Sequence, residues 1–373
     1  MLKKIFGYNI RIESDFPKGK VYENLERALI YYKDVLDDNI DIEIKILRKE
    51  KFNGEKYNLM NPKSFYYKDN ESAIIIGDKI VEKKIVEDKL YINIYLEYNT
   101  SKSILSILKK MISYEYKNSL EVFPQFFYEM VLIPIVSFDK KRALIHCSGI
   151  FYKNKVIFLG GTGGVGKTST LIELGREKEI GFICDDILVI DECNFYENYA
   201  YPKIYAYNVI GDKELERKIL SKESFLSKLH WMIKKKINIS KVRRKIFPEE
   251  LYRIELEKKL SLKKIYIILS RGNYQEMKLK KLKSNIAKEI TKNIILSEYK
   301  SYVEIKNYED INISLLKEEI GKNKQSILEK WNNIYNKFFE EMDTYILEIP
   351  KDLGHNIFKK NMKKIVAEFL ERE

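Results

Sequence analysis

The stretch Val156-Ile-Phe-Leu-Gly-Gly-Thr-Gly-Gly-Val-Gly-Lys-Thr-Ser-Thr170 contains three patterns in succession. Its first four residues form a short apolar run, which is typical of a buried strand. Residues 161–168 fit the motif G-x-x-x-x-G-K-[ST] at every fixed position, and a helical pattern of apolar residues begins at Thr168. The sequence therefore predicts a strand, a glycine-rich loop and a helix, which is the context that this motif requires.

The loop itself predicts a binding site for phosphate. Glycines let the backbone curl with its N–H groups pointing inward, and these groups form a cradle for an anion together with the N-terminus of the next helix. We expect Lys167 to reach the β- and γ-phosphates of ATP and the hydroxyl of Thr168 to hold Mg²⁺. The alternative is a glycine-rich turn that only joins a strand to a helix. The residues predicted to bind the nucleotide are Gly161, Thr162, Gly163, Gly164, Val165, Gly166, Lys167, Thr168 and Ser169.

Two adjacent carboxylates follow the loop. Asp185 and Asp186 lie 18 and 19 residues after Lys167, in the middle of the apolar run 180–190. We expect this run to be a strand next to the loop strand, because only one helix and one turn separate them. A carboxylate there can accept a hydrogen bond from a Mg²⁺-bound water or take the proton of an attacking hydroxyl, so both residues are predicted to be catalytic and Asp185 to act at the metal. The alternative is a pair of turn aspartates on the surface.

A histidine precedes the loop at a fixed distance. His146 lies fifteen residues before Gly161, within Ile145-His146-Cys147-Ser148-Gly149. Taken alone, its apolar neighbours suit a histidine of the core. Together with the loop and the paired aspartates, however, this segment resembles the catalytic domain of HPr kinase/phosphorylase. That family belongs with phosphoenolpyruvate carboxykinase in one structural superfamily, and the resemblance covers roughly residues 140–275.

The resemblance implies an α/β fold with a phosphate-binding-loop (P-loop) kinase core of the type of the HPr kinase C-terminal domain. It also implies roles for single residues: His146 matches the active-site histidine, Lys167 the phosphate-binding lysine and Thr168 the Mg²⁺-binding serine of the family. Asp186 matches the carboxylate that deprotonates the acceptor hydroxyl. Because the segment between Lys167 and the pair is one residue longer here, either Asp185 or Asp186 can hold that role. Relatives are commonly oligomers, so a homo-oligomer is implied.

The chain also departs from the family. The downstream metal-binding glutamate has no clear counterpart, although Asp212 and Glu214 lie in about the right region. The long C-terminal signature, which contains glycine and arginine and is tied to phosphorolysis and to the HPr protein, is not found. We therefore expect an acceptor other than HPr. Arg271 is either a charge-stabilising arginine or a turn arginine, and the segment 201–205 is expected to line the acceptor pocket.

Composition narrows the partners and the compartment. The 373 residues include 33% charged side chains and carry a net charge of +13, but this lysine excess is diffuse. The densest basic run covers residues 234–245, and two interpretations are open: it binds an anionic acceptor or phosphates, or it is a solvated face of the protein. The run lacks the interleaved aromatic residues that are typical of nucleic-acid binding. Three cysteines without C-x-x-C spacing indicate a reducing cytoplasm. The apolar region 123–138 is too short and too interrupted to span a bilayer.

The remaining patterns predict the organisation of the chain. Alternating apolar runs indicate a strand-rich N-terminal lobe over residues 1–138, which we expect to be antiparallel. Residues 139–373 are predicted to hold the kinase core and C-terminal helices at 285–299, 311–342 and 356–371, interrupted by a strand at 345–349.

The sequence thus favours an ATP- and Mg²⁺-dependent kinase that phosphorylates a hydroxyl of a protein serine, a peptide or a small molecule. GTP or pyrophosphate as the phosphate donor stays open. Two other functions are also open: a nucleotide hydrolase or switch, for which the guanine-specific N-K-x-D motif is absent at a suitable place, and a non-catalytic nucleotide-binding protein.

Overall fold

The computed structural model describes residues 1–16, 20–36, 39–57, 59–61, 65–68, 71–87, 89–97, 104–117, 121–136, 141–254, 263–299 and 322–371. It is a mixed α/β structure with several sheets, which confirms the predicted α/β class. The chain divides into two compact units, each assembled from three segments. The first unit contains 1–101, 119–143 and 299–334, and the second contains 102–118, 144–298 and 335–373. The continuous division at residue 138 stays a prediction.

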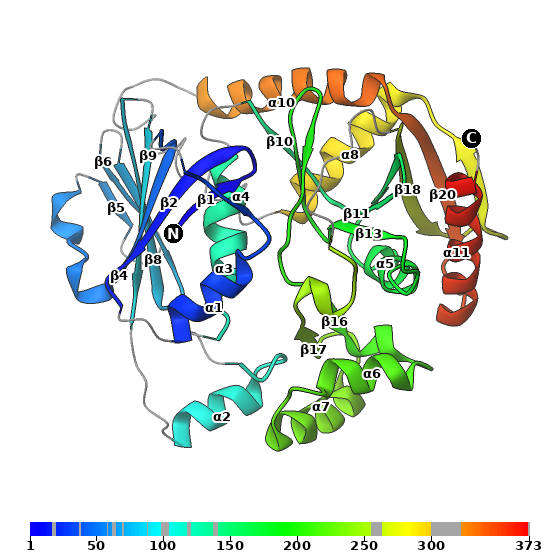
Figure 1. Ribbon diagram of the computed structural model, residues 1–373, viewed down its shortest axis with the longest axis horizontal. Helices are drawn as coiled ribbons and strands as arrows, with labels where there is room; N and C mark the ends of the chain where they lie inside the picture. The colour runs from blue at the N-terminus through cyan, green and yellow to red at the C-terminus, as the bar shows by residue number, and fades with distance from the viewer. Residues whose placement is uncertain are drawn as a thin grey trace. The chain divides into compact units, whose positions relative to one another are not determined.

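The first unit is built on a nine-stranded sheet in the order β3-β1-β2-β4-β9-β8-β7-β6-β5 (Figure 1). Alternate residues of its strands are buried, as in Ile42, Ile44 and Ile46, so one face packs against the core of the unit. Its strands are β1 Leu2–Ile5, β2 Tyr8–Ser14, β3 Lys33–Asp34, β4 Ile42–Arg48, β5 Leu59–Asn61, β6 Phe65–Lys68, β7 Glu71–Ile76, β8 Lys79–Val86 and β9 Lys89–Leu96, with 3-10 turns η1 Lys49–Lys51 and η2 Gly54–Lys56.

The expectation of a purely antiparallel lobe is wrong for this sheet. Strand β4 pairs in parallel with β2 on one side and with β9 on the other, whereas the remaining pairs are antiparallel. A parallel pair needs a crossover connection, and helix α1 Lys20–Ala28 lies between β2 and β4 in sequence. Alternating hydrophobicity shows that one face of a strand is buried, but it does not give the direction of the neighbouring strand.

The apolar region that starts at Phe123 is a buried helical segment in the first unit. It runs through α3 Phe123–Phe127, the π-helical turn η3 Tyr128–Leu132 and α4 Ile133–Ile135. The hydroxyl of Tyr128 donates to the carbonyl of Ala28 over 2.8 Å, which attaches this segment to α1.

The second unit is built on a six-stranded sheet in the order β13-β11-β12-β18-β20-β19. The three central strands β12, β18 and β20 are parallel, and the others pair antiparallel. Smaller sheets have the orders β10-β14-β15 and β16-β17. The strands are β10 Ala143–Ile145, β11 Cys147–Tyr152, β12 Lys155–Gly160, β13 Gly181–Cys184, β14 Leu188–Ile190, β15 Phe195–Tyr196, β16 Lys203–Tyr205, β17 Arg243–Lys245, β18 Lys263–Gly272, β19 Lys278–Lys281 and β20 Asp343–Pro350.

Continuous apolar runs explain the central strands of this sheet. Val156, Ile157, Phe158 and Leu159 of β12 are fully buried, as expected for a parallel strand with helices on both faces. Helix α5 follows β12, and α11 follows β20 and packs against α5 (Figure 1). The helices with residues in this unit are α2 Ile104–Ile112, α5 Lys167–Leu174, α6 Lys213–Leu220, α7 Phe225–Ile237, α8 Ser284–Glu298, α10 Lys322–Glu340 and α11 His355–Glu371, with 3-10 turns η4 Ala206–Val209 and η5 Pro248–Glu250.

The predicted C-terminal elements match this part of the chain well. Helices α8 and α11 and strand β20 lie within a few residues of the predicted bounds. The predicted helix 311–342 corresponds to α10 from Lys322 onward, and residues 311–321 lie outside the described residues.

Candidate functional site

The glycine-rich loop joins β12 to α5, as the sequence predicts. Two of its glycines are required by geometry, because Gly161 and Gly166 have φ angles of 138° and 113°. A Cβ at Gly161 would lie 2.8 Å from the carbonyl oxygen of Leu269, and one at Gly166 would lie 2.4 Å from the ring of Phe358 on α11. The strand β18 and the helix α11 therefore confine the loop from two sides, and only glycine fits at these turns.

Lys167 starts helix α5 and is buried. Its ammonium group donates to the carbonyl oxygens of Gly161 and Thr162 over 2.8 and 2.9 Å, so the side chain curls back over the loop. Burial lowers the pKa of Lys167, and the negative charges of Asp186, Asp185 and Glu298 oppose this shift. A cation is thus held against the loop backbone, close to three carboxylates.

The paired aspartates do not lie within one strand. Strand β13 ends at Cys184 and β14 begins at Leu188, and Asp186 sits at the break with a left-handed φ of 86°. The expectation that their strand is next to the loop strand is also wrong. Strand β11 lies between them, because β11 and β12 form a hairpin and β13 pairs with the other edge of β11. The number of residues between Lys167 and the aspartates predicts one helix and one turn. It does not show that β11, which precedes the loop strand β12, occupies the position next to β12 in the sheet.

Despite the intervening strand, Asp185 reaches the loop. The hydroxyl of Thr168 lies 3.1 Å from both carboxylate oxygens of Asp185, and the hydroxyl of Ser148 on β11 donates to Asp185 over 2.6 Å. Burial raises the pKa of Asp185, and so does the charge of Asp186, whereas the two hydroxyls and Lys167 lower it. This carboxylate is therefore buried next to the first turn of α5, and its hydrogen bonds with the described residues come from hydroxyl groups.

Asp186 has a different environment from its neighbour. One of its oxygens lies 2.8 Å from Nε2 of His146 and the other 3.6 Å from Nζ of Lys203, while its side chain remains 56% exposed. Partial burial raises its pKa, but the hydrogen bond from His146 and the charges of Lys203 and Lys167 outweigh burial, so the pKa of Asp186 lies well below its usual value. Two adjacent aspartates thus have pKa values shifted in opposite directions, which is a common feature of sites that use carboxylates chemically.

His146 lies at the break between β10 and β11 and is 5% exposed. Within the described part of the chain, its Nδ1 has no hydrogen-bond partner, so its only polar contact there is the one to Asp186. The ring of His146 is therefore buried, and its Nε2 atom faces Asp186.

A third carboxylate occupies the loop itself. The backbone N–H of Gly163 donates to Oε1 of Glu298, the last residue of α8, over 2.8 Å. Glu298 is 135 residues away in the sequence, and no motif pointed to it. In this contact, one backbone N–H group of the loop donates to an anionic side chain.

Three residues of this site received no individual role from the sequence: Ser148, Lys203 and Glu298. Ser148 lies two residues after His146, and Lys203 lies within the segment that was expected to line the acceptor pocket. Both residues could therefore have been proposed from the sequence, because each lies next to a predicted site residue or within a predicted site segment. Glu298 carried no such signal.

Other candidates have structural partners. Ser169 is buried, and its hydroxyl accepts from Nδ2 of Asn208 over 2.8 Å. Asp212 caps helix α6 by accepting from the backbone N–H of Leu215 over 3.0 Å, and it also pairs with Arg176. Arg271 donates to the carbonyl of Leu353 over 3.2 Å. None of these contacts joins the side chain to the Asp185–Asp186 pair.

The donor set at the loop fits Mg²⁺ and does not fit a metal held by protein ligands alone. Among the described residues, no group of three or more His, Cys, Asp or Glu side chains is arranged to hold a metal ion. Mg²⁺ commonly takes one or two protein oxygens and completes its shell with phosphates and water. The adjacent oxygens of Thr168 and Asp185 provide such a partial set.

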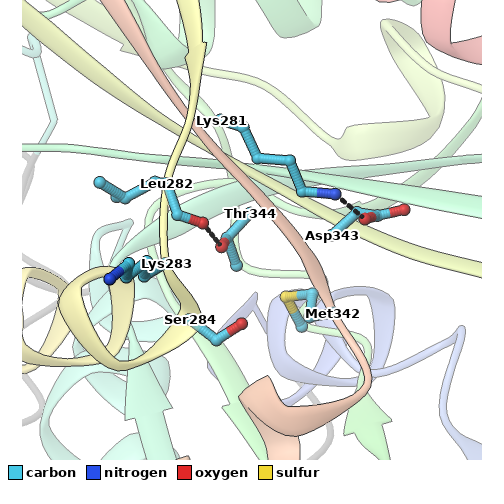
Figure 2. A pocket seen from close by; sticks show the side chains of 7 residues that line it. All are labelled: Lys281, Leu282, Lys283, Ser284, Met342, Asp343 and Thr344. Atoms are coloured by element: carbon cyan, nitrogen blue, oxygen red, sulfur yellow. Dashed lines mark hydrogen bonds and ion pairs between the residues drawn. The ribbon is translucent and has the colours of Figure 1, made fainter.

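One pocket in the second unit lies apart from these residues. It is lined by residues from the end of β19, the start of α8 and the start of β20. Figure 2 shows Lys281 paired with Asp343 and the hydroxyl of Thr344 donating to the carbonyl of Leu282. These polar groups already bind one another, and none of the predicted site residues lines the pocket.

No protein-family model and no curated protein matched the chain. Among the described residues, no helix is both long and apolar enough to cross a membrane.

Proposed function

We propose that this protein is an ATP- and Mg²⁺-dependent kinase with a P-loop core of the HPr kinase type, and that it transfers the γ-phosphoryl group to a hydroxyl. One observation carries most of the weight: the hydroxyl of Thr168 touches both oxygens of Asp185, and the next residue, Asp186, faces His146. A loop that only joined a strand to a helix would not need a carboxylate pair aligned with its first helical hydroxyl.

Binding of the triphosphate is supported by the loop and its lysine. The N–H of Gly163 already donates to a carboxylate, and Lys167 lies against the loop as a buried cation. Thr168 and Asp185 would hold Mg²⁺, which neutralises charge on the β- and γ-phosphates. In this arrangement the residues 161–169 bind the nucleotide, and Ser169 contributes through its backbone.

In the proposed transfer step, Asp186 receives the proton of the acceptor hydroxyl. The acceptor oxygen forms a bond to the γ-phosphorus, the bond from that phosphorus to the β,γ-bridging oxygen breaks, and the hydroxyl proton passes to Asp186. A carboxylate with a low pKa suits a loose transition state, in which positioning of the hydroxyl matters more than early removal of its proton. His146 and Lys203 hold Asp186 ionised and in place.

The acceptor is a protein serine, a peptide or a small molecule, and the missing HPr-related signature argues against HPr. Lys203 supports the expected position of the acceptor pocket, since it lies in segment 201–205 and contacts Asp186. All three cysteines are free thiols, which supports a reducing cytoplasm.

The test is phosphate transfer from ATP labelled in the γ-position, with Mg²⁺, to metabolite, peptide and protein pools. We expect labelled acceptor with the wild type and none with Lys167→Ala. Lys153→Ala is the matched control, because Lys153 is an exposed lysine of the same unit outside the loop. Equal transfer by Lys167→Ala and the control would refute the kinase assignment.

The same experiment separates the other functions. Release of free phosphate without any labelled acceptor, lost in Lys167→Ala, would indicate a nucleotide hydrolase. ATP binding without turnover, retained in Asp185→Asn and Asp186→Asn, would indicate a non-catalytic nucleotide-binding protein.

A further inference from the structure

Helices α2 and α7 of the second unit present apolar side chains to the solvent. Phe225 and Ile237 of α7 are 77% and 72% exposed, and Ile112 of α2 is 74% exposed. The two helices are neighbours, because Nε2 of His230 lies 2.8 Å from the carbonyl oxygen of Ser113, just after α2. The exposed apolar residues of this surface, named here the α2–α7 face, are Ile107, Leu108, Ile112, Phe225, Leu226, Met232, Ile233 and Ile237.

The exposure of α7 does not come from a loose helix. Its opposite side is anchored in the unit: Trp231 is fully buried, and the buried guanidinium of Arg244 on β17 donates to the carbonyl of Ser227 over 2.8 Å. At helical spacing, Phe225, Leu226, Met232, Ile233 and Ile237 share the outward side. A firmly packed helix with a continuous apolar outer side is unusual for a surface exposed only to water.

The same two helices carry positive charge without carboxylates. Helix α2 contains two lysines and α7 contains four, and neither helix contains Asp or Glu. Nearby acidic residues are already paired, Glu216 with Lys235 and Glu115 with Arg243. The α2–α7 face therefore combines aliphatic and aromatic side chains with lysines of the same two helices, of which Lys235 is paired with Glu216.

We propose that the α2–α7 face binds the surface of an anionic lipid bilayer. Aliphatic and aromatic side chains of an amphipathic helix insert at the boundary of headgroups and acyl chains, and lysines beside them are attracted to anionic headgroups. This binding is independent of the proposed phosphotransfer, because it uses neither the loop nor the aspartates.

Charge and shape favour this occupant over others. A second copy of the chain would bring two lysine-rich faces together and repel. A nucleic acid would match the lysines but leave six isoleucine and leucine side chains beside phosphates or base edges. The exposed side chains project outward from two helices, which a fluid bilayer accommodates without a complementary pocket.

The experiment uses the full chain and co-sedimentation with vesicles. One set of vesicles contains only phosphatidylcholine, and the other contains phosphatidylcholine with phosphatidylglycerol. We expect binding to the anionic vesicles at low salt, weaker binding at high salt, and little binding to the neutral vesicles. The double substitution Phe225→Ser and Ile237→Ser should weaken the binding at least about tenfold, because each side chain contributes apolar burial in the bilayer.

The matched control is Ile357→Ser, which removes an exposed isoleucine from α11 of the same unit. It should leave vesicle binding unchanged, and the melting temperature of both variants should stay close to that of the wild type. Absence of wild-type binding to anionic vesicles, or equal binding by the double variant, would overturn the proposal. A change of oligomeric state in the double variant without vesicle binding would instead assign the face to self-association.

Discussion

Glu82 in the first unit and Asp185 in the second are both buried, but their surroundings differ. Glu82 accepts hydrogen bonds from the hydroxyls of Tyr57 and Tyr95 over 2.6 and 2.9 Å and from Nδ2 of Asn93 over 2.6 Å. Lys56 lies 2.6 Å from the same carboxylate. Among the described residues, by contrast, only two hydroxyls donate to Asp185, and Asp186 is more than half exposed.

The difference in the number of donors separates Glu82, a structural carboxylate, from Asp185 and Asp186, which remain available to bind a ligand. Four donors leave Glu82 little capacity for another ligand, and burial together with Glu82 raises the pKa of Tyr57 and Tyr95, so both phenols stay protonated as donors. The Asp185–Asp186 pair keeps lone pairs free for a cation or a substrate proton. Burial alone would have marked Glu82 and Asp185 equally, whereas the number of donors distinguishes them.

The largest expected effect comes from changing Asp186 without changing its shape. Asp186→Asn removes the proposed proton acceptor, and we expect the proposed transfer of phosphate to fall by about 10²- to 10⁴-fold, as for the loss of a general base. Nucleotide affinity should change little, since Asp186 does not contact the loop. Transfer rates with labelled ATP and equilibrium nucleotide binding measure the two effects.

The control for this substitution is Glu82→Gln, which also replaces a carboxylate by an amide, but at the carboxylate that already has four donors. It should leave phosphate transfer unchanged once the protein is folded. Loss of transfer in Glu82→Gln, or full transfer in Asp186→Asn, would remove the distinction drawn between the two sites.

A smaller effect is expected on the stability of the first unit. Glu82→Gln replaces a charged acceptor that serves Tyr57, Tyr95 and Lys56, so the free energy of unfolding should fall by about 1–3 kcal/mol. Each unit contains one buried tryptophan, Trp331 in the first and Trp231 in the second. Fluorescence of Trp331 in a Trp231→Phe background therefore reports unfolding of the first unit by denaturant.

The dependence of stability on acidic pH provides a second measure of the contribution of Glu82. Burial raises the pKa of Glu82, but hydrogen bonds from Lys56, Tyr57 and the other donors outweigh it, so this pKa lies below the usual 4.5. A depressed pKa in the folded state stabilises the fold above about pH 4.5, and the stabilisation is lost as pH falls through the folded value. The wild type should therefore lose stability over this range more steeply than Glu82→Gln, and parallel curves would contradict the assignment.

The smallest expected effect concerns Glu298, whose carboxylate binds the loop of the available site. An incoming phosphate must displace it, so Glu298→Ala should bind ATP about three- to tenfold more tightly. Glu289→Ala, which removes an exposed carboxylate from the same helix α8, is the control. Weaker binding in Glu298→Ala would mean that this carboxylate assists the nucleotide instead of competing with it.

Local signals in the sequence predicted the centre of the second unit well. The strand, loop and helix around residues 156–174 follow from glycine geometry and apolar runs, and both of these are local properties. The sequence assigned Thr168 and Asp185 to one metal ion, and the structure places their side chains 3.1 Å apart, although by another route than the one inferred. Strand β11 lies between the two strands, so the contact depends on the register of a hairpin that periodicity does not encode.

Long-range pairing explains most of what could not be predicted. Glu298 reaches Gly163 across 135 residues, and β2, β4 and β9 run in parallel although their patterns resemble those of antiparallel strands. Such contacts are fixed by the packing of whole elements. Single residues near a recognised motif, such as Lys203, are easier to find than partners that arrive from a distant helix.

The left-handed backbone of Asp186 limits how this position can change over evolutionary time. Its φ of 86° is accessible to Gly, Asn and Asp but strained for most other residues. Even in a relative without the proposed phosphate transfer, substitutions at this position would be confined to those few residue types. Homologues that lack this activity should therefore carry Asn or Gly at position 186, whereas the residue at position 203 would vary freely.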